Sequence, residues 1–593
     1  MNQPFSSKET SLSIDLDKLF SLSEAELESA LKPLKFEELM EILLRAPWES
    51  KARLILLSPY PTGLVRNLPL IEFFLTLKAS SLEQAVELLS HAKGSQIQFL
   101  FDFDAWFKDR LKAERILSWL ILIYEAGEDL LKRWLEVADW DFLIAMMQKF
   151  LRIHKRSDEV DILEARDFLP PFTLDDFYFV EFKDEAVEFY FRRIIEIIRD
   201  EWPEMYFSLM EALIAELPSE VEERAFRFRN GRLADEGIPD YFTSLEVYSY
   251  IHPRGLSTVV REYLPGDVSE GGQILYLLPY EGEGKLPIFN ILGMIGDTDV
   301  LVRIQRELAW LATKVTLVDH PVIDGIEEVK GGIFKMWAGL NLGIEYLAGS
   351  DLEKAKSILE NHYLEEIFRV SRTALRELRR FALSIVTGKD FNPVVLKYLD
   401  QPYEGYLKGV LAKNLNEVKL FNPAMIGTSE EYVEFSRVGE LRMVRRYLEE
   451  IAYIAPLLER SLGSPSHWIK EVLKPSRNFD HMVLTWSSLI LTAISSYLLN
   501  GEFIFRAVPR SRWQELLQSL IDIKDGNGYL KDSIKEILTE NFKKLARSHY
   551  YVDEDLLTGF MNFVFNRFEG EFRYVDLENP PDPLYQNLIL VEL

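Results

Sequence analysis

The stretch "EDLLKRWLEVA" (residues 128–138) decides the fold class, because two earlier stretches share its pattern: "ELMEILLRA" (38–46) and "LEQAVELLSHA" (82–92). In each one, apolar residues fall three and four positions apart, as one buried face of an α-helix requires. A short polar link and a second apolar run follow each stretch, which is typical of two-helix units that stack into a solenoid. The sequence therefore predicts an all-α protein whose N-terminal part is a helical repeat. Equivalent leucines recur every 46 residues, at Leu43, Leu89 and Leu135.

The rest of the chain divides where its composition changes. An aromatic, acidic stretch with a Pro-Pro break begins near residue 156, and glycine and proline concentrate in residues 264–300. Helical patterning then resumes. The predicted segments are a flexible N-terminus (1–22), a helical-repeat region (23–155), a second helical region (156–263), a loop-rich joint (264–300), a larger C-terminal helical domain (301–570) and an extended tail (571–593).

Composition disfavours several classes of function. The 593 residues carry 68 basic and 95 acidic side chains, and this net charge of −27 disfavours nucleic acid and anionic membranes as partners. The chain has no cysteine, which removes disulfides and thiolate chemistry and favours a cytoplasmic setting. The uncharged stretch "MVLTWSSLILTAISSYLLN" (482–500) is long enough to span a membrane. Its serines and threonines, without a flanking basic cluster, predict a buried core helix instead.

Motifs for catalysis and metal binding are incomplete in this chain. "FLFDFDAW" (99–106) resembles the Asp-x-Asp of phosphatases with an aspartate nucleophile, but alignment of the repeats places it in a helix. "GEGK" (282–285) lacks the other residues of a phosphate loop. His362 and Glu365 lie one helical turn apart, yet two ligands do not make a metal site. We therefore assign no catalytic residue, no metal site and no cofactor.

The stretch "IDIKDGNGYLKD" (521–532) resembles the middle of a calcium-binding EF-hand loop. Such a loop needs oxygen ligands at both ends and glycine at its sixth position. Placing Gly528 at that position puts Ile523 at the first position and Ile534 at the last, and an isoleucine side chain offers calcium no oxygen. Apolar helical faces flank the stretch on both sides. The sequence therefore predicts the tight turn of a helical hairpin, with no calcium bound.

Four arginines in "EEIFRVSRTALRELRRFAL" (365–383) are spaced three, four and three residues apart: Arg369, Arg372, Arg376 and Arg379. This spacing places their guanidinium groups on one face of a helix. In such an acidic chain, this face indicates an anionic group, an acidic partner, or ion pairs with acidic helices of the same chain. Aromatic residues do not interleave with the arginines as they do in many nucleic-acid-binding segments, which disfavours nucleic acid. Ion pairs with acidic helices of the same chain are the favoured explanation.

A second charged region covers residues 217–250. Its arginines and acidic residues are spaced for pairing along a helix, and Arg227 and Asp235 project to nearly the same side. An ion-paired helix that joins two domains explains this pattern, and a pocket for an acidic group is the alternative. The candidate anion- or partner-binding residues of this region are Arg227, Arg232 and Asp235.

Three stretches together resemble a known family: "QIQFLFDFDAWFKDRLKAERILSWL" (96–120), "EERAFRFRNGRLADEGIPDYFTSLEVY" (222–248) and "LNLGIEYLAGSDLEKAKSILENHYLEEIFRV" (340–370). They are similar to a bacterial family catalogued as domain of unknown function 6178, and the resemblance covers most of the chain. It implies a bacterial intracellular protein. It supplies no activity, cofactor or catalytic residue.

The sequence predicts a cytoplasmic scaffold or adaptor that binds another protein, because helical repeats form extended binding surfaces and the catalytic motifs are incomplete. The alternative is an enzyme or a small-ligand-binding protein with an arginine-lined anion pocket at the joint between the helical halves. A deep cleft whose arginines have no acidic neighbours would favour this alternative. Arginines held in internal ion pairs would favour the adaptor.

Overall fold

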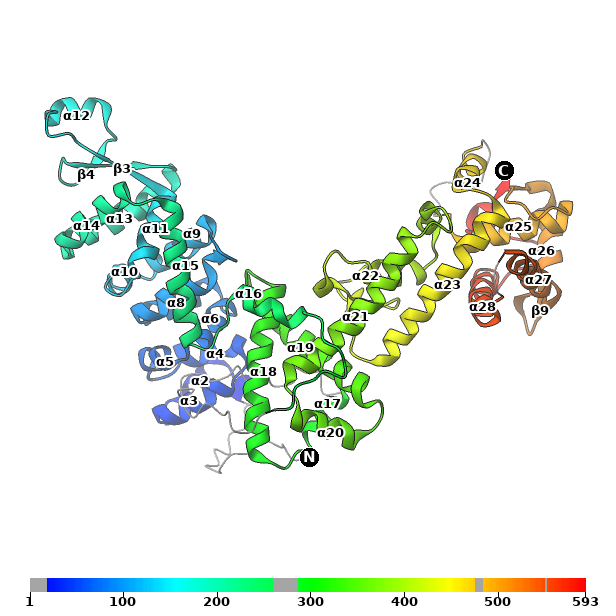
Figure 1. Ribbon diagram of the computed structural model, residues 1–593, viewed down its shortest axis with the longest axis horizontal. Coiled ribbons are helices and arrows are strands. Elements are labelled where there is room, and N and C mark those ends of the chain that lie inside the picture. Colours follow the sequence, from blue (N-terminus) through cyan, green and yellow to red (C-terminus); the bar gives the residue numbers. More distant parts are fainter. Residues whose placement is uncertain (1–18, 260–285, 475–483, 550–551, 593) are drawn as a thin grey trace. The chain divides into compact units, whose positions relative to one another are not determined.

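The computed structural model describes residues 19–259, 286–474, 484–549 and 552–592 (Figure 1). Most of these residues are α-helical and the strands are short, so the predicted all-α class is confirmed. The chain forms two compact units. Unit 1 comprises Met1–Leu340 and Ala348–Arg369, and unit 2 comprises Asn341–Leu347 and Val370–Leu593. Most of the predicted flexible N-terminus (1–18), most of the predicted joint (264–285) and the "GEGK" stretch lie outside the described residues.

Unit 1 is built mainly from short helices, with two small antiparallel sheets. One sheet is the hairpin of β1 (Trp106–Phe107) and β2 (Arg110–Leu111), and the other has the strand order β3-β5-β4. The latter strands are β3 (Leu151–Lys155), β4 (Phe172–Thr173) and β5 (Tyr178–Phe182). The helices that lie wholly in unit 1 are α2 (Glu24–Leu31), α3 (Phe36–Arg45), α4 (Trp48–Leu56), α5 (Pro61–Asn67), α6 (Leu70–Lys78), α7 (Leu82–Ser90), α8 (Gly94–Asp104), α9 (Ala113–Glu125), α10 (Glu128–Leu135), α11 (Trp140–Phe150), α12 (Ile162–Phe168), α13 (Glu185–Glu201), α14 (Pro203–Ala215), α15 (Pro218–Asp235), α16 (Tyr241–Ser244), η1 (Leu245–Tyr248), α17 (Pro287–Leu292), α18 (Thr298–Asp319) and α20 (Leu352–Asn361).

Three helix pairs occupy the stretches that predicted a repeat, namely α3–α4, α7–α8 and α10–α11. Side-chain caps mark the start of two of these helices. Ser81 and Gln84 form a capping box at α7, and the side chain of Asp139 caps α11. Further elements separate the pairs, with α5 and α6 in the first interval and β1, β2 and α9 in the second. Counting the pair that begins it, the first interval therefore holds four helices and the second holds three helices and a β-hairpin, so the repeat stays a prediction. The long helix α15 packs along α8 and α11 (Figure 1).

Unit 2 has its own core, centred on the long helix α23 (Val438–Leu462). Two helices cross the division between the units, α19 (Ile326–Ala348) and α21 (Leu364–Thr387). Aromatic and aliphatic side chains from α23, α25 (Trp486–Asn500), α27 (Asp532–His549) and α28 (Glu554–Glu571) form one buried cluster. The elements that follow α21 are η3 (Pro393–Tyr398), α22 (Tyr403–Val410), η4 (Leu415–Glu417), β6 (Leu420–Phe421), β7 (Tyr432–Val433), α23 (Val438–Leu462), α24 (Pro465–Val472), α25 (Trp486–Asn500), β8 (Val508–Pro509), η5 (Arg510–Arg512), α26 (Trp513–Leu520), β9 (Ile521–Lys524), β10 (Asn527–Leu530), α27 (Asp532–His549), α28 (Glu554–Glu571), η6 (Pro583–Tyr585) and β11 (Val591–Glu592).

The uncharged stretch forms α25, and every residue from Trp486 to Ser496 is buried. Its prediction as a buried core helix is confirmed for this part of the stretch, while residues 482 and 483 lie outside the described residues. Across the described ranges, no helix combines the length and the apolar character that crossing a membrane would require.

The prediction of a helical hairpin at residues 521–532 is wrong. Strands β9 and β10 pair in an antiparallel hairpin between α26 and α27. Asp525 and Gly526 form its two-residue turn, with φ of +51° and +75°. These left-handed values fit the twist of a two-residue β-hairpin, for which Asp-Gly is a preferred sequence. The same residue types therefore serve a β-turn rather than a link between helices.

Candidate functional site

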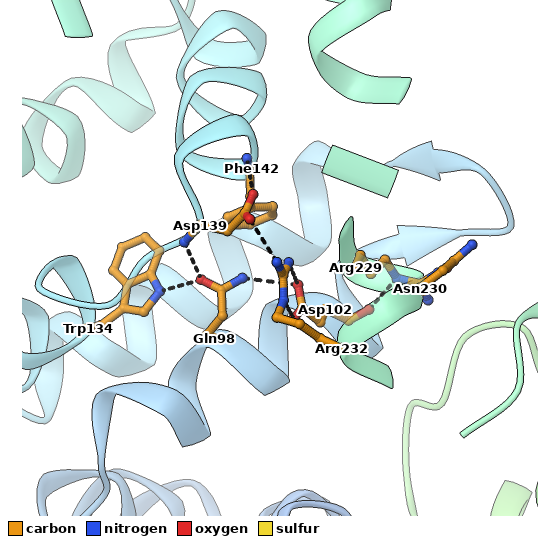
Figure 2. A network of polar contacts seen from close by, with 8 residues as sticks. All are labelled: Gln98, Asp102, Trp134, Asp139, Phe142, Arg229, Asn230 and Arg232. Atoms are coloured by element: carbon orange, nitrogen blue, oxygen red, sulfur yellow. Dashed lines mark hydrogen bonds and ion pairs between the residues drawn. The ribbon is translucent and has the colours of Figure 1, made fainter. Parts of the chain in front are cut away.

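Arg232 lies in a buried polar network that joins α15 to α8 and to the start of α11 (Figure 2). Its Nε and Nη2 donate to the two carboxylate oxygens of Asp102 at 2.6 and 2.8 Å, and its Nη1 donates to Asp139 at 2.7 Å. Gln98 donates a further hydrogen bond to Asp102. Burial alone would lower the pKa of Arg232, but its contacts with the two aspartates raise it. Arg232 is therefore held as a cation by acidic neighbours inside unit 1.

The two other candidates on α15 do not share this network. The side chain of Arg227 is 75% exposed and forms a surface ion pair with Glu223 at 3.4 Å. Asp235 is exposed near the C-terminal end of the helix. The structure therefore does not gather Arg227, Arg232 and Asp235 into one pocket.

The four arginines of α21 also lie in different environments. Arg372 is fully buried, with its Nη1 3.9 Å from a carboxylate oxygen of Glu434. Arg379 donates to the carbonyl oxygens of Ala412 and Lys413, and Arg376 is partly buried. These three residues belong to unit 2, whereas Arg369 belongs to unit 1. The guanidinium groups therefore do not form one exposed stripe.

Arg369 lines a cleft in unit 1, formed by α18 and the start of α21, that encloses about 330 Å³. Trp310 is 40% exposed and Tyr363 is 37% exposed, so both rings are open to solvent. Exposed tryptophan, tyrosine and arginine side chains beside a concavity are typical of protein-binding hot spots. The residues that line this cleft are Glu307, Trp310, Tyr363, Glu365, Glu366 and Arg369.

Side chains of α18 form one wall of the cleft, and their neighbours one helical turn away hold them in place. Glu307 accepts hydrogen bonds from Nη1 of Arg303, one turn earlier, and from the backbone N–H of Leu364, at 2.9 and 2.7 Å. Lys314, one turn after Trp310, donates to Glu365 at 2.9 Å. The side chains of Arg303 and Lys314 are largely buried. Burial raises the pKa of Glu307, although the Leu364 N–H and the Arg303 charge oppose this shift.

The other wall uses side chains of α21 that bind backbone groups. Glu366 accepts a hydrogen bond from the N–H of Ser257 at 2.6 Å, and Nη2 of Arg369 donates to the carbonyl oxygen of Tyr250 at 3.2 Å. Glu365 and Glu366 thus each use Oε2, and within the described residues Oε1 of each accepts no hydrogen bond. The cleft therefore presents free carboxylate acceptors beside two aromatic rings.

Sequence reasoning selected Arg369 but missed the rest of the cleft. Neither Trp310 nor Tyr363 stands out in the sequence, because aromatic residues on amphipathic helices are usually buried. His362, considered above as a metal ligand with Glu365, instead donates to the carbonyl oxygen of Ser257. In the described parts of the chain, no group of three His, Cys, Asp or Glu side chains is placed to hold a metal ion.

These features define a large, mostly α-helical protein with a polar and aromatic surface cleft. The chain belongs to the family of unknown function DUF6178, which matches residues 28–592. The resemblance predicted from three stretches of sequence is therefore confirmed. Comparison with curated proteins and with solved structures finds no match.

Proposed function

We propose that this protein is a cytoplasmic scaffold or adaptor that binds another protein through the cleft between α18 and α21. The exposed rings of Trp310 and Tyr363 carry this proposal, since they lie with Arg369 around one concavity. Tryptophan, tyrosine and arginine account for much of the binding energy in protein interfaces. Such rings also lose little conformational entropy when a partner covers them.

An arginine-lined anion pocket has less support. Arg232 is neutralised by Asp102 and Asp139, and Arg369 shares its cleft with three glutamates. An anionic ligand in this cleft would meet those carboxylates at close range, which is unfavourable. The chemistry of the lining side chains therefore favours a protein partner over a small anion.

Affinity purification from the native host, with the tagged full-length chain, tests the proposal. The variant Trp310→Ala, Tyr363→Ala should lose a partner that the wild type recovers, and the purified partner should bind this variant at least about tenfold more weakly. Phe228→Ala is the matched control, because Phe228 is an exposed aromatic residue of unit 1 on another helix. Equal recovery with all three proteins, or recovery of the chain alone at physiological salt, would contradict the proposal.

A further inference from the structure

We infer that the cleft selects a basic side chain, lysine or arginine, of its protein partner. This inference rests on the proposed function and adds the chemistry of the group that enters the cleft. It uses three observations on the described residues: the carboxylate oxygens that accept no hydrogen bond, the position of Lys314 against Trp310, and the size of the concavity.

The three glutamates of the cleft differ in whether a side-chain cation pairs with them. Three of its side chains are glutamates and one is an arginine. Two buried cations already pair with two of the glutamates, Arg303 with Glu307 and Lys314 with Glu365. Glu366 forms no such ion pair in the described residues, and its hydrogen bond comes from a backbone N–H. Its negative charge is therefore available to an incoming ammonium or guanidinium group.

Arg369 balances the remaining negative charge of the lining, but it leaves two carboxylate oxygens of the cleft without a hydrogen-bond donor in the described residues. Its Nε and Nη2 are directed to the carbonyl oxygens of Ser249 and Tyr250, at 3.5 and 3.2 Å. Those contacts draw the guanidinium toward the segment that follows η1. The Oε1 atoms of Glu365 and Glu366 accept nothing from the described part of the chain, so they supply two acceptors for a donor-rich head group.

The protein already places one cation against a ring of this cleft. Nζ of Lys314 lies 5.4 Å from the centroid of the Trp310 ring while it binds Glu365. Lys314 thus makes a cation–π contact with Trp310 and an ion pair with the carboxylate of Glu365 at the same time. The exposed surfaces of Trp310 and Tyr363 offer the same combination to a side chain from outside. The aliphatic part of a lysine or arginine would cover the rings while its charged end reaches the glutamates.

The volume of the cleft limits the size of the group. About 330 Å³ is at the lower end of the range for ligand pockets, so the concavity suits one long side chain rather than a folded element. The rest of an interface would then lie on the surface around it.

Fluorine NMR of the full-length chain labelled with 5-fluorotryptophan tests the inference. Trp310→Phe identifies the Trp310 resonance. The probes are N-acetyl-arginine amide and N-acetyl-lysine amide, with N-acetyl-citrulline amide as the uncharged isostere. The two basic probes should shift this resonance saturably, and citrulline should bind at least about tenfold more weakly. Glu366→Gln should weaken the basic probes by a similar factor, while the exposed control Glu223→Gln should not.

The outcomes separate this inference from the proposed function. Equal binding of citrulline and arginine, or no saturable shift with either basic probe, would overturn the selection of a basic side chain. If Glu366→Gln also left the affinity for the purified partner unchanged while Trp310→Ala, Tyr363→Ala abolished it, the adaptor would stand without this selectivity. Retention of the partner by that double variant would overturn the adaptor itself.

Discussion

Asp102 and Arg232, 130 residues apart in the sequence, face each other through two parallel hydrogen bonds of 2.6 and 2.8 Å. This bidentate geometry is among the strongest that a guanidinium and a carboxylate can form. Asp102 is 2% exposed, so the pair joins α8 and α15 inside unit 1. The first aspartate of the phosphatase-like motif is therefore part of the scaffold that supports the helices.

Replacing Arg232 with alanine should destabilise unit 1 by about 3 kcal/mol, because Asp102 would stay buried without its main counter-charge. Hydrogen exchange followed by mass spectrometry on peptides of α8 and α15 would report this loss as faster exchange. Arg227→Ala is the control on the same helix, and its exposed side chain should contribute less than about 0.5 kcal/mol. Similar exchange in the two variants would show that the Asp102–Arg232 pair is not a stabilising contact.

The β-hairpin of unit 2 makes a prediction about Gly528. A Cβ atom at this position would lie 2.5 Å from the carbonyl oxygen of Phe572, which is a backbone atom that cannot move aside easily. Gly528→Ala should therefore lower the stability of unit 2 by about 2 kcal/mol. Gly439→Ala is the control, since a Cβ there meets nothing within 4 Å and alanine favours the helix α23. Thermal unfolding should show a lower Tm for the first variant alone, and equal Tm values would contradict the hairpin packing.

The raised pKa of Glu307 predicts a pH dependence of stability. The folded chain keeps a proton on this carboxyl group at pH values where the unfolded chain has lost it. The corresponding stabilisation is fully present below the ordinary pKa of 4.5 and is lost as the pH rises through the raised value. The free energy of unfolding of the wild type, relative to Glu307→Gln, should therefore fall across this window and level off above it.

Denaturation from about pH 4 to pH 7 would measure this difference. Glu223→Gln, at an exposed position of unit 1, is the comparison variant. A difference for Glu307→Gln that rose with pH would mean that the pKa of Glu307 is lowered in the folded chain.

Calcium should leave the stability of the protein unchanged. The pairing of Ile521 with Leu530 closes the hairpin, so the polar side chains around Asp525 do not encircle a central point as EF-hand ligands do. Thermal unfolding with and without micromolar calcium checks this expectation. A large increase in Tm would show that the hairpin rearranges into a calcium site.

Local patterns in the sequence predicted much of the fold. Helical periodicity located α3, α7 and α10, because a buried helical face repeats with a fixed spacing. The hairpin at Asp525 and Gly526 was also visible in principle, since Asp-Gly favours a two-residue β-turn. The flanking helical patterns suggested helices on both sides, and they masked four-residue strands that are too short to show a clear alternation.

The candidate site could not be predicted in the same way. Asp102 meets Arg232, and Glu307 meets Leu364, through the packing of helices that are distant in the sequence. The sequence correctly shows that α21 carries arginines at helical spacing. It does not show that Arg372 is buried while Arg369 borders a cleft, because exposure depends on which other helices cover each turn.

Site-specific photocrosslinking tests the central claim most directly. The photoreactive amino acid p-benzoylphenylalanine, placed at Tyr363 in the full-length chain, should form a covalent adduct with the protein partner in the native host. The same amino acid at Phe228 should not form this adduct. The adduct should contain the same protein that the double variant Trp310→Ala, Tyr363→Ala fails to recover. An adduct of equal yield from Phe228, or no adduct from Tyr363 while the partner still binds, would contradict docking at the cleft.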